Sequence, residues 1–256
     1  MLLTVDIGNT HIVLACMECG KVFAQARLAS DRLKTDFEYA VSLKEFFQMN
    51  GISADSVEGA CISSVNPELT KLVSSAVRRI TGKEALAVGA GVKTGLNIRI
   101  DNPAECGADL VTAAVGALRR YKPPLIIIDL GTATTFSVID STGAFIGGAI
   151  APGLKTSVEA LSDKTALLPG IALETPGAAI GKNTADCMRS GAILGTAGMI
   201  DGMIDRMSAE LGEKLRVVAT GGLAGTVVPF CTHDIETAGD LILEGLEAVY
   251  EKNRKK

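Results

Sequence analysis

The sequence predicts an α/β protein of two similar halves, each a mixed β-sheet flanked by helices. An internal repeat is the first reason: placing residues 3–8 over residues 126–131 also brings Gly20 over Gly143 without a gap. Both copies then show three β-rich runs separated by turns. Finally, helical and strand patterns alternate after each copy, which is typical of a sheet covered by helices.

The first half is expected to span residues 1–122. Its β-rich runs are residues 3–7, residues 12–16 and the stretch after Gly20. Hydrophobic periodicity then predicts helices and strands in alternation, over residues 37–50, 59–65, 67–81 and 85–88. An apolar helix follows from about residue 107 to residue 119, and the break between the halves falls at Lys122-Pro123-Pro124.

The second half is expected to span residues 123–256. Its β-rich runs end in a turn at Gly131 and continue over residues 134–140 and beyond Gly143. The remaining pattern predicts a long helix over residues 184–211, a strand over residues 216–220 and a last helix over residues 238–252. Each half is therefore a complete α/β domain.

The composition excludes several classes of protein. The chain has 256 residues, 47% of them apolar, and a net charge of -4, so it can bury a large core and offers no basic surface for nucleic acid. No apolar run reaches the roughly 18 residues of a membrane-spanning helix. The six cysteines are scattered rather than spaced as a disulfide framework. We expect a soluble cytoplasmic protein that does not bind a membrane.

The two Asp-x-Gly turns are the strongest functional signal. A phosphate chain is held by backbone N–H groups in tight turns, and a glycine permits the positive φ and the close approach that this needs. An aspartate at the preceding strand end can hold hydrated magnesium. Asp6-Ile7-Gly8 and Asp129-Leu130-Gly131 both follow this pattern. One such tripeptide is common in hairpins, but two at equivalent places predict nucleotide binding.

The segment from Asp101 to Asp109 supplies the best candidate for a base. A kinase needs a group that orients the acceptor hydroxyl toward the γ-phosphate. Asn102-Pro103 forms a turn, and Asp109 then lies in the first turn of the following helix, beside free N–H donors that favour an anionic substrate group. Alternatively, Asp109 only complements the helix dipole.

Two glycine patterns in the second half are less specific signals of function than the Asp-x-Gly turns. Thr220-Gly221-Gly222 ends a strand with a turn that could hold an adenine ring against the backbone. The long helix carries four glycines on one face, which indicates close approach by a neighbouring helix, either within the domain or across a dimer interface. These glycines are Gly191, Gly195, Gly198 and Gly202.

Taken together, these motifs resemble the type III pantothenate kinases. The resemblance rests on the two Asp-x-Gly turns, on Asn102-Pro103 with Gly107-Ala108-Asp109, and on residues 148–153 and 181–184, in order along nearly the whole chain. It implies a duplicated actin-like ATPase fold, with a cleft between two mixed-sheet domains. It also implies ATP-dependent phosphorylation of the 4′-hydroxyl of pantothenate in coenzyme A biosynthesis.

The resemblance also implies roles for individual residues and a homodimer. Asp109 would be the catalytic proton acceptor, Asp129 would help to bind the monovalent cation, K⁺ or NH₄⁺, and Asp6 would bind the Mg²⁺ that accompanies ATP. ATP contacts are implied for Asp6, Ile7, Gly8, Asn9, Thr10, His11, Ile12, Val13 and Thr132. Pantothenate contacts are implied for Gly107, Ala108, Asp109, Leu110 and Thr184.

The chain departs from the family pattern at two positions. The family commonly has Arg after Gly-x-Asp and Tyr shortly before Asn-Pro, whereas this chain has Leu110 and Ile100. An arginine there would pair with the pantothenate carboxylate. Arg99 or the helix N-terminus near Gly107 is the expected replacement. Two alternatives stay open: a kinase of the same fold for another hydroxylated carboxylate or sugar, and a non-catalytic nucleotide-binding regulator.

Overall fold

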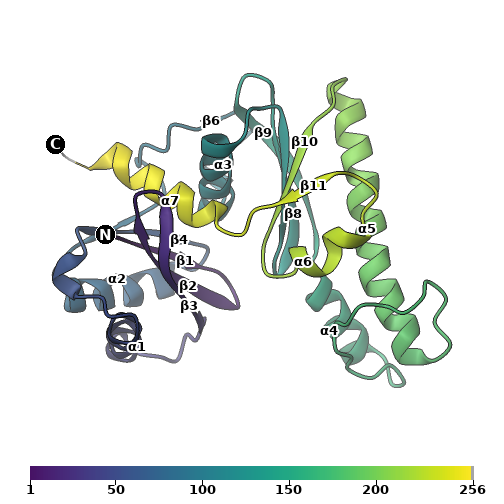
Figure 1. Cartoon of the computed structure of the whole chain (residues 1–256), viewed down its shortest axis with the longest axis horizontal. Helices are drawn as coiled ribbons and strands as arrows, with labels where there is room; N and C mark the ends of the chain where they lie inside the picture. The colour runs from purple at the N-terminus through teal and green to yellow at the C-terminus, as the bar shows by residue number, and fades with distance from the viewer. Residues whose placement is uncertain (255–256) are drawn as a thin grey trace. The chain divides into compact units, whose positions relative to one another are not determined.

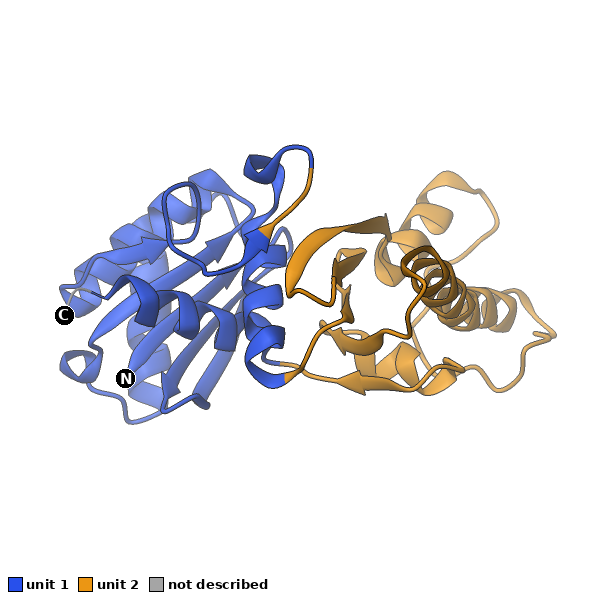
Figure 2. Cartoon of the chain, turned by 90° about the horizontal axis from the view of Figure 1, so that it is seen from above, with its two compact units in different colours: residues 1–97, 101–120, 240–256 blue, residues 98–100, 121–239 orange. Residues whose placement is uncertain are grey.

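The computed structural model describes residues 1–254, which form two compact units (Figure 2). Unit 1 contains residues 1–97, 101–120 and 240–254. Unit 2 contains residues 98–100 and 121–239. Each unit has its own sheet and its own helices, as the sequence predicts for two mixed-sheet α/β domains.

Unit 1 is built on a five-stranded sheet in the order β3-β2-β1-β4-β5. Its strands β1 to β4 are labelled in Figure 1. Strands β1, β2 and β3 form an antiparallel meander, and β4 and β5 extend it in parallel from β1. The strands are β1 (Leu2–Ile7), β2 (His11–Glu18), β3 (Lys21–Ala29), β4 (Gly59–Ser64) and β5 (Ala85–Ala87).

Helices cover both faces of this sheet. Leu3, Val5 and Ile7 of β1 lie in one core with residues of the first two helices, whereas Leu2 contacts the cluster that includes Leu243 on the opposite face. This alternation is the period-2 pattern of a strand buried on both sides. The helices are α1 (Asp36–Met49), α2 (Pro67–Thr81), α3 (Ala108–Arg120) and α7 (Leu241–Asn253), with 3₁₀ turns at Ala54–Ser56 and Pro103–Glu105.

Unit 2 repeats this plan with one additional strand, in the order β11-β10-β7-β8-β9-β6. Its strands are β7 (Leu125–Leu130), β8 (Ala133–Ile139), β9 (Ala144–Pro152), β10 (Arg216–Thr220), β11 (Ile235–Thr237) and β6 (Asn97–Ile98). Its helices are α4 (Leu154–Lys164), α5 (Thr184–Leu211) and α6 (Ala224–Val227), with a 3₁₀ turn at Val228–Phe230. Ile193, Ala197, Ile200 and Ile204 of α5 form an apolar stripe in the core of this unit.

The two sheets show that the gapless sequence repeat hides two compensating shifts. Ile7 lies opposite Ile12 in the first unit, with four residues between them, whereas Leu130 lies opposite Thr134, with three. The next turn of unit 2 is longer: Glu18 lies opposite Lys21, but Ile139 lies opposite Phe145. The second Asp-x-Gly turn is therefore a residue tighter than the first.

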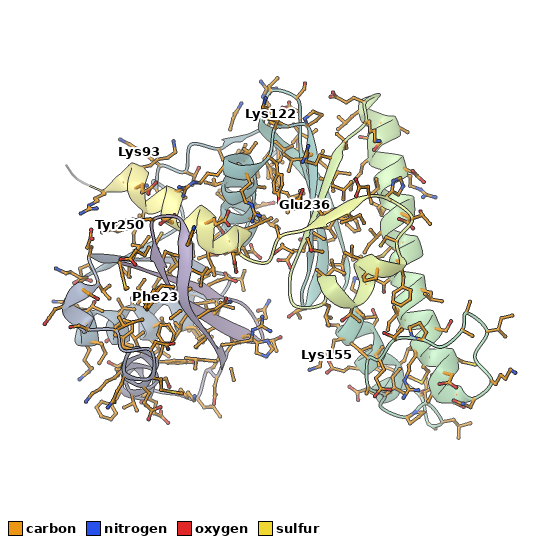
Figure 3. All side chains as sticks on the ribbon, in the orientation of Figure 1. Phe23, Lys93, Lys122, Lys155, Glu236 and Tyr250 are labelled. Atoms are coloured by element: carbon orange, nitrogen blue, oxygen red, sulfur yellow. The ribbon has the colours of Figure 1, made fainter. Side chains whose placement is uncertain are left out.

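Helix α7 belongs to unit 1, although it comes last in the sequence. Leu246 of this helix packs with Cys61 of β4 and Val115 of α3. The hydroxyl of Tyr250, which is labelled on α7 in Figure 3, donates to Glu58 O over 3.4 Å, directly before β4. The end of the chain therefore completes the first unit rather than the second.

Residues 98–100 belong to unit 2, although they lie within the first half of the sequence. Arg99 N donates to Phe145 O of β9 over 2.8 Å and so continues the pairing of β6. The division of the duplicated sequence at residue 122 stays a prediction, since it concerns the repeat rather than these contacts. No helix among residues 1–254 is both long and apolar enough to cross a bilayer.

Candidate active site

The first Asp-x-Gly turn joins the central strands β1 and β2 of unit 1. Asp6 is half-buried at the end of β1, and Asn9, Thr10 and His11 are exposed beyond it. Gly8 N donates to His11 O over 2.9 Å, and the Ser30 hydroxyl donates to Gly8 O over 2.7 Å, so the turn is fixed on both sides. Ile7 and Ile12 are buried and point into the core. Among the residues predicted to contact ATP, Ile7 and Ile12 therefore place their side chains in the core, and only their backbone atoms lie at the turn.

The second turn joins β7 and β8 in unit 2 and is held from one side by the start of α4. Gly131 N donates to Ala133 O over 3.0 Å and closes the turn. Thr132, at its tip, is exposed, and its carbonyl accepts from Gly153 N over 3.2 Å and from the Thr156 hydroxyl over 2.8 Å. A side chain at Gly153 would collide with the carbonyls of the turn. This close approach fixes the Thr132 backbone.

Gly221 also lies close against the second turn. It follows β10 directly, has φ +92°, and leaves no room for a Cβ atom, which would meet Asp129 Oδ1 and the backbone of Leu130. Both the dihedral angle and the contact therefore require glycine. The sequence marked Gly221 as part of an adenine-binding turn, and the structure shows that it also packs on the predicted cation ligand, Asp129.

A hydroxyl residue lies beside each of the two strand-end aspartates. Ser63 of β4 is opposite Asp6 in the parallel register, and Thr220 of β10 is opposite Asp129 in the same way. Both hydroxyl residues are buried, and Ser63 Oγ has no hydrogen-bond partner. Leaving a buried hydroxyl unpaired costs about 1–3 kcal/mol. The sequence marks Thr220 only as part of the adenine-binding turn and does not single out Ser63, because the pairing of each hydroxyl with an aspartate depends on the strand register.

Asp109 lies in the first turn of α3, as predicted. Its Oδ1 accepts from Leu110 N over 2.9 Å, and a side chain at Gly107 would collide with the same oxygen. The glycine thus allows the carboxylate to lie close against the backbone. Burial, and then the charge of Asp109, raise the pKa of the neighbouring Cys106 thiol. Gly107, Ala108, Asp109 and Leu110 are all half-buried.

Helix α3 is held in unit 1 by α7. Gly116 of α3 and Gly245 of α7 have no room for a Cβ atom, because each lies against a backbone carbonyl of the other helix. Arg119 Nη1 lies 3.1 Å from Glu247 Oε2, and Glu247 Oε1 accepts from Gly20 N over 3.1 Å. The buried Glu247 carboxylate therefore joins α3 and α7 to the β2–β3 turn. These contacts fix the helix that carries Asp109.

The remaining predicted residues lie in unit 2. Thr184 is exposed at the start of α5, where the Asn183 side chain caps the helix by accepting from Asp186 N over 2.9 Å. Arg99 pairs with Asp140 at 3.5 Å, so its guanidinium already has an anionic partner. Hydrogen bonds, the strongest from the Thr142 hydroxyl, hold the pKa of Asp140 below its usual value.

The structure offers few protein ligands for a metal ion. Among residues 1–254 there is no group of three or more His, Cys, Asp or Glu side chains that could hold one. Mg²⁺ is usually bound by one or two carboxylates together with substrate phosphates and water. The donor set at Asp6, a strand-end carboxylate beside an unpaired hydroxyl, fits such an ion.

Comparison with solved structures identifies the fold. The ROK hexokinase of Thermus thermophilus matches with a TM-score of 0.50 and 10% identity, covering 99% of both chains. The activator of the 2-hydroxyisocaproyl-CoA dehydratase of Clostridium difficile, with bound ADPNP, matches with a TM-score of 0.53 and 11% identity, over 100% of this chain and 98% of that one. The fold is thus the duplicated α/β fold of actin-like ATPases and sugar kinases.

The sequence comparisons assign the chain to one family. The family model for the type III pantothenate kinases matches residues 2–206. A type III pantothenate kinase of Moorella thermoacetica is 42% identical over 253 residues, which cover 99% of this chain and 100% of that one. The chain belongs to the type III pantothenate kinase family.

Proposed function

We propose that this protein transfers the γ-phosphate of ATP to the 4′-hydroxyl of pantothenate, in coenzyme A biosynthesis. The observation that carries the proposal is the family match over residues 2–206, which includes Asp6, Asp109 and Asp129. All three aspartates lie at the ends of secondary-structure elements, where a ligand can reach them. Because its substrates are small polar molecules, we further propose a cytoplasmic location.

In this proposal ATP is bound by both Asp-x-Gly turns. Residues 6–13 and Thr132 contact the nucleotide, with exposed side chains at Asn9, Thr10, His11 and Thr132. Asp6 binds Mg²⁺ and its water shell. The bound cation would supply charge neutralisation of the triphosphate. Asp129 binds the monovalent cation, K⁺ or NH₄⁺, with Gly221 fixing one side of its carboxylate.

Asp109 is the proposed acceptor of the pantothenate hydroxyl proton. Its Oδ1 is kept near the helix start by Leu110 N and lies close against Gly107, where any other residue would displace it. Gly107, Ala108, Leu110 and Thr184 are the further proposed substrate contacts. A positioned general base contributes about 10²–10⁴-fold to the rate.

The N-terminus of α3 is the proposed partner of the pantothenate carboxylate. An arginine is absent at Leu110, and Arg99 is paired with Asp140, so neither provides an uncommitted guanidinium. Helix N-termini carry a partial positive charge that stabilises anions. Replacing Arg99 with alanine should leave the KM for pantothenate unchanged. An increase of tenfold or more in that KM would instead indicate that Arg99 binds the pantothenate carboxylate.

We also propose a homodimer. Gly191, Gly195 and Gly198 lie on the surface of α5, and a Cβ atom at any of the three would meet no described atom within 4 Å. No helix of the described chain therefore uses this face. The glycines weaken the helix, and close packing of a second copy on the same face would offset that cost.

A substrate panel tests the proposed reaction against its alternatives. With Mg²⁺, K⁺ and ATP, release of ADP should require pantothenate, and mass spectrometry should detect the phosphorylated product. Phosphorylation of a sugar or another hydroxy acid in preference to pantothenate would favour a kinase of the same fold with a different acceptor. Intact nucleotide binding without transfer to any acceptor would favour a regulatory protein.

A further inference from the structure

Ser63 is a buried group that the proposed reaction does not yet use. It is the second-last residue of β4, its exposed fraction is 0%, and its Oγ has no hydrogen-bond partner. Buried hydroxyls in folded proteins are nearly always paired, so an unpaired one requires an explanation. Alanine would fill almost the same space without an unpaired oxygen.

The position of Ser63 in the sheet indicates which group it serves. Val5 and Ile62 point into the core beneath α1 and α2, whereas Cys61 packs with Val115 of α3 and Leu246 of α7 on the opposite face. Since side chains alternate along a strand, Ser63 shares the face of Cys61, and Asp6 lies on the same face as its partner in the register. Neighbouring strands are about 4.8 Å apart. The hydroxyl and the carboxylate are therefore side by side.

The second unit contains the same pair. Thr220 lies opposite Asp129 in the parallel register of β10 and β7, as Ser63 lies opposite Asp6 in that of β4 and β1. Thr220 is also buried, with an exposed fraction of 3%. A hydroxyl beside the strand-end aspartate thus occurs in both units, at positions fixed by strand pairing alone.

We propose that Ser63 is a positioning residue for Asp6: when magnesium and ATP bind, its hydroxyl donates a hydrogen bond to the Asp6 carboxylate and fixes the oxygen that faces the cation. This inference rests on the proposed role of Asp6. Carboxylates that hold a cation are usually hydrogen-bonded in turn, and loss of such a partner typically lowers metal affinity or activity about 10–100-fold. The half-buried Asp6 carboxylate gains a fixed orientation from a donor that water cannot displace.

The variant Ser63→Ala tests the inference through magnesium-dependent nucleotide binding. Affinity for a non-hydrolysable ATP analogue is measured by calorimetry at a series of Mg²⁺ concentrations and in EDTA. We expect the half-saturating Mg²⁺ concentration to rise about 10-fold or more, with the affinity in EDTA unchanged. The variant should also melt at the same temperature as the wild type or above it, because an unpaired buried hydroxyl is removed. Ser63→Thr, with the residue found at position 220, should restore the magnesium dependence.

Thr4→Val is the matched control. Thr4 is buried two residues before Asp6 on the same strand, and its hydroxyl donates to Ala15 O over 3.3 Å. Losing this satisfied hydrogen bond should lower the melting temperature but leave the magnesium dependence unchanged. An equal change in magnesium dependence in Thr4→Val and Ser63→Ala would overturn the inference, since it would reflect general disturbance of the sheet.

A double-mutant cycle with Asp6→Asn separates this inference from the proposed function. If Ser63 acts through Asp6, Ser63→Ala has no further effect on magnesium dependence in the Asp6→Asn background. Wild-type magnesium dependence in Ser63→Ala, or a full additional effect in the double variant, would overturn the role of Ser63 alone. If Asp6→Asn itself left the magnesium dependence unchanged, the proposed role of Asp6 would fail, and this inference with it.

Discussion

Gly221 is the residue on which the geometry of the second turn depends most directly. Alanine there must adopt φ +92° and would collide with Asp129 and the Leu130 backbone. A left-handed conformation costs a non-glycine residue about 1–2 kcal/mol, and overpacking typically adds about 1–3 kcal/mol. We therefore expect Gly221→Ala to lower the melting temperature markedly and to weaken activation by K⁺.

Gly212→Ala is the matched control for this prediction. Gly212 caps α5 in the same unit with φ +68°, but an alanine Cβ atom at this position would meet nothing within 4 Å. Only the conformational cost of about 1–2 kcal/mol applies there. Thermal unfolding of both variants checks the comparison, and an equal loss in the two would show that the contact with Asp129 is unimportant.

The cysteines provide a second prediction at this scale. Burial raises the pKa of the Cys16 thiol to about 11 and that of the Cys61 thiol to about 12, whereas Cys19 and Cys187 are exposed. The thiolate is the reactive form. At pH 8 a disulfide reagent should modify Cys19 and Cys187 in the native protein and reach Cys16 and Cys61 only after denaturation.

The same pKa shifts predict alkaline sensitivity. The folded state retains the thiol protons that the unfolded chain releases above pH 9.0. Because the folded-state pKa is raised, the contribution to the free energy of unfolding is complete below pH 9.0 and is lost as the pH rises toward 11 and 12. Urea titrations at increasing pH should show this loss, and it should shrink in Cys61→Ala. Rapid labelling of Cys61 in the native protein at pH 8 would contradict the prediction that its thiol is buried and protonated.

Individual site residues were accessible from the sequence only where a turn or a helix start marked them. Asp6, Asp129 and Asp109 could be selected because glycines and element ends surround them. The pairing of Ser63 with Asp6 and of Thr220 with Asp129 could not be predicted, because it appears only when the strand register is known. The contact between Gly153, directly before α4, and the second turn also depends on packing, so it cannot be predicted from the sequence alone.

At the scale of elements, the crossing of α3 and α7 is the contact most sensitive to side-chain size. A Cβ atom at Gly116 would collide with the Leu241 carbonyl of α7. Gly116→Ala should destabilise the protein by about 1–3 kcal/mol, and thus lower the melting temperature by several degrees. A melting temperature at or above the wild-type value would show that the two helices can separate without cost.

The exposed glycine face of α5 gives the opposite prediction. Alanine at Gly195 meets open space in the single chain and should stabilise the helix by up to about 1 kcal/mol. A bulky Gly195→Leu substitution should instead convert a dimer to monomers in analytical ultracentrifugation, if a second copy packs on this face. A wild-type monomer, or an undisturbed Gly195→Leu dimer, would contradict the proposed interface.

Helices with local capping residues were predicted closely, and elements defined by packing were not. The helices at 67–81 and 184–211 and the strand at 216–220 match the observed bounds, because Asn66, Asn183 and Gly212 cap the helices locally. Strand β6 is only two residues long and exists through its pairing in the second sheet. No local pattern could have predicted it.

At the scale of the whole molecule, the repeat predicted the duplicated fold but not the exchange of segments between units. Two copies of the same strand order follow from the repeated meander. The assignment of α7 to unit 1 depends on contacts with Cys61 and Val115, far away in the sequence. The difference in turn length between the two copies was hidden, because the shorter second Asp-x-Gly turn is offset by a longer turn after it and the alignment needs no gap.

The most direct test of the account is the rate of pantothenate phosphorylation by Asp109→Asn, with Asp101→Asn as control. Asp101 is exposed and precedes the helix, so its loss should leave kcat unchanged. Asp109→Asn should lower kcat by about 10²–10⁴-fold while binding the ATP analogue as tightly as the wild type. A variant at Asp109 that phosphorylates pantothenate at the wild-type rate would contradict the account.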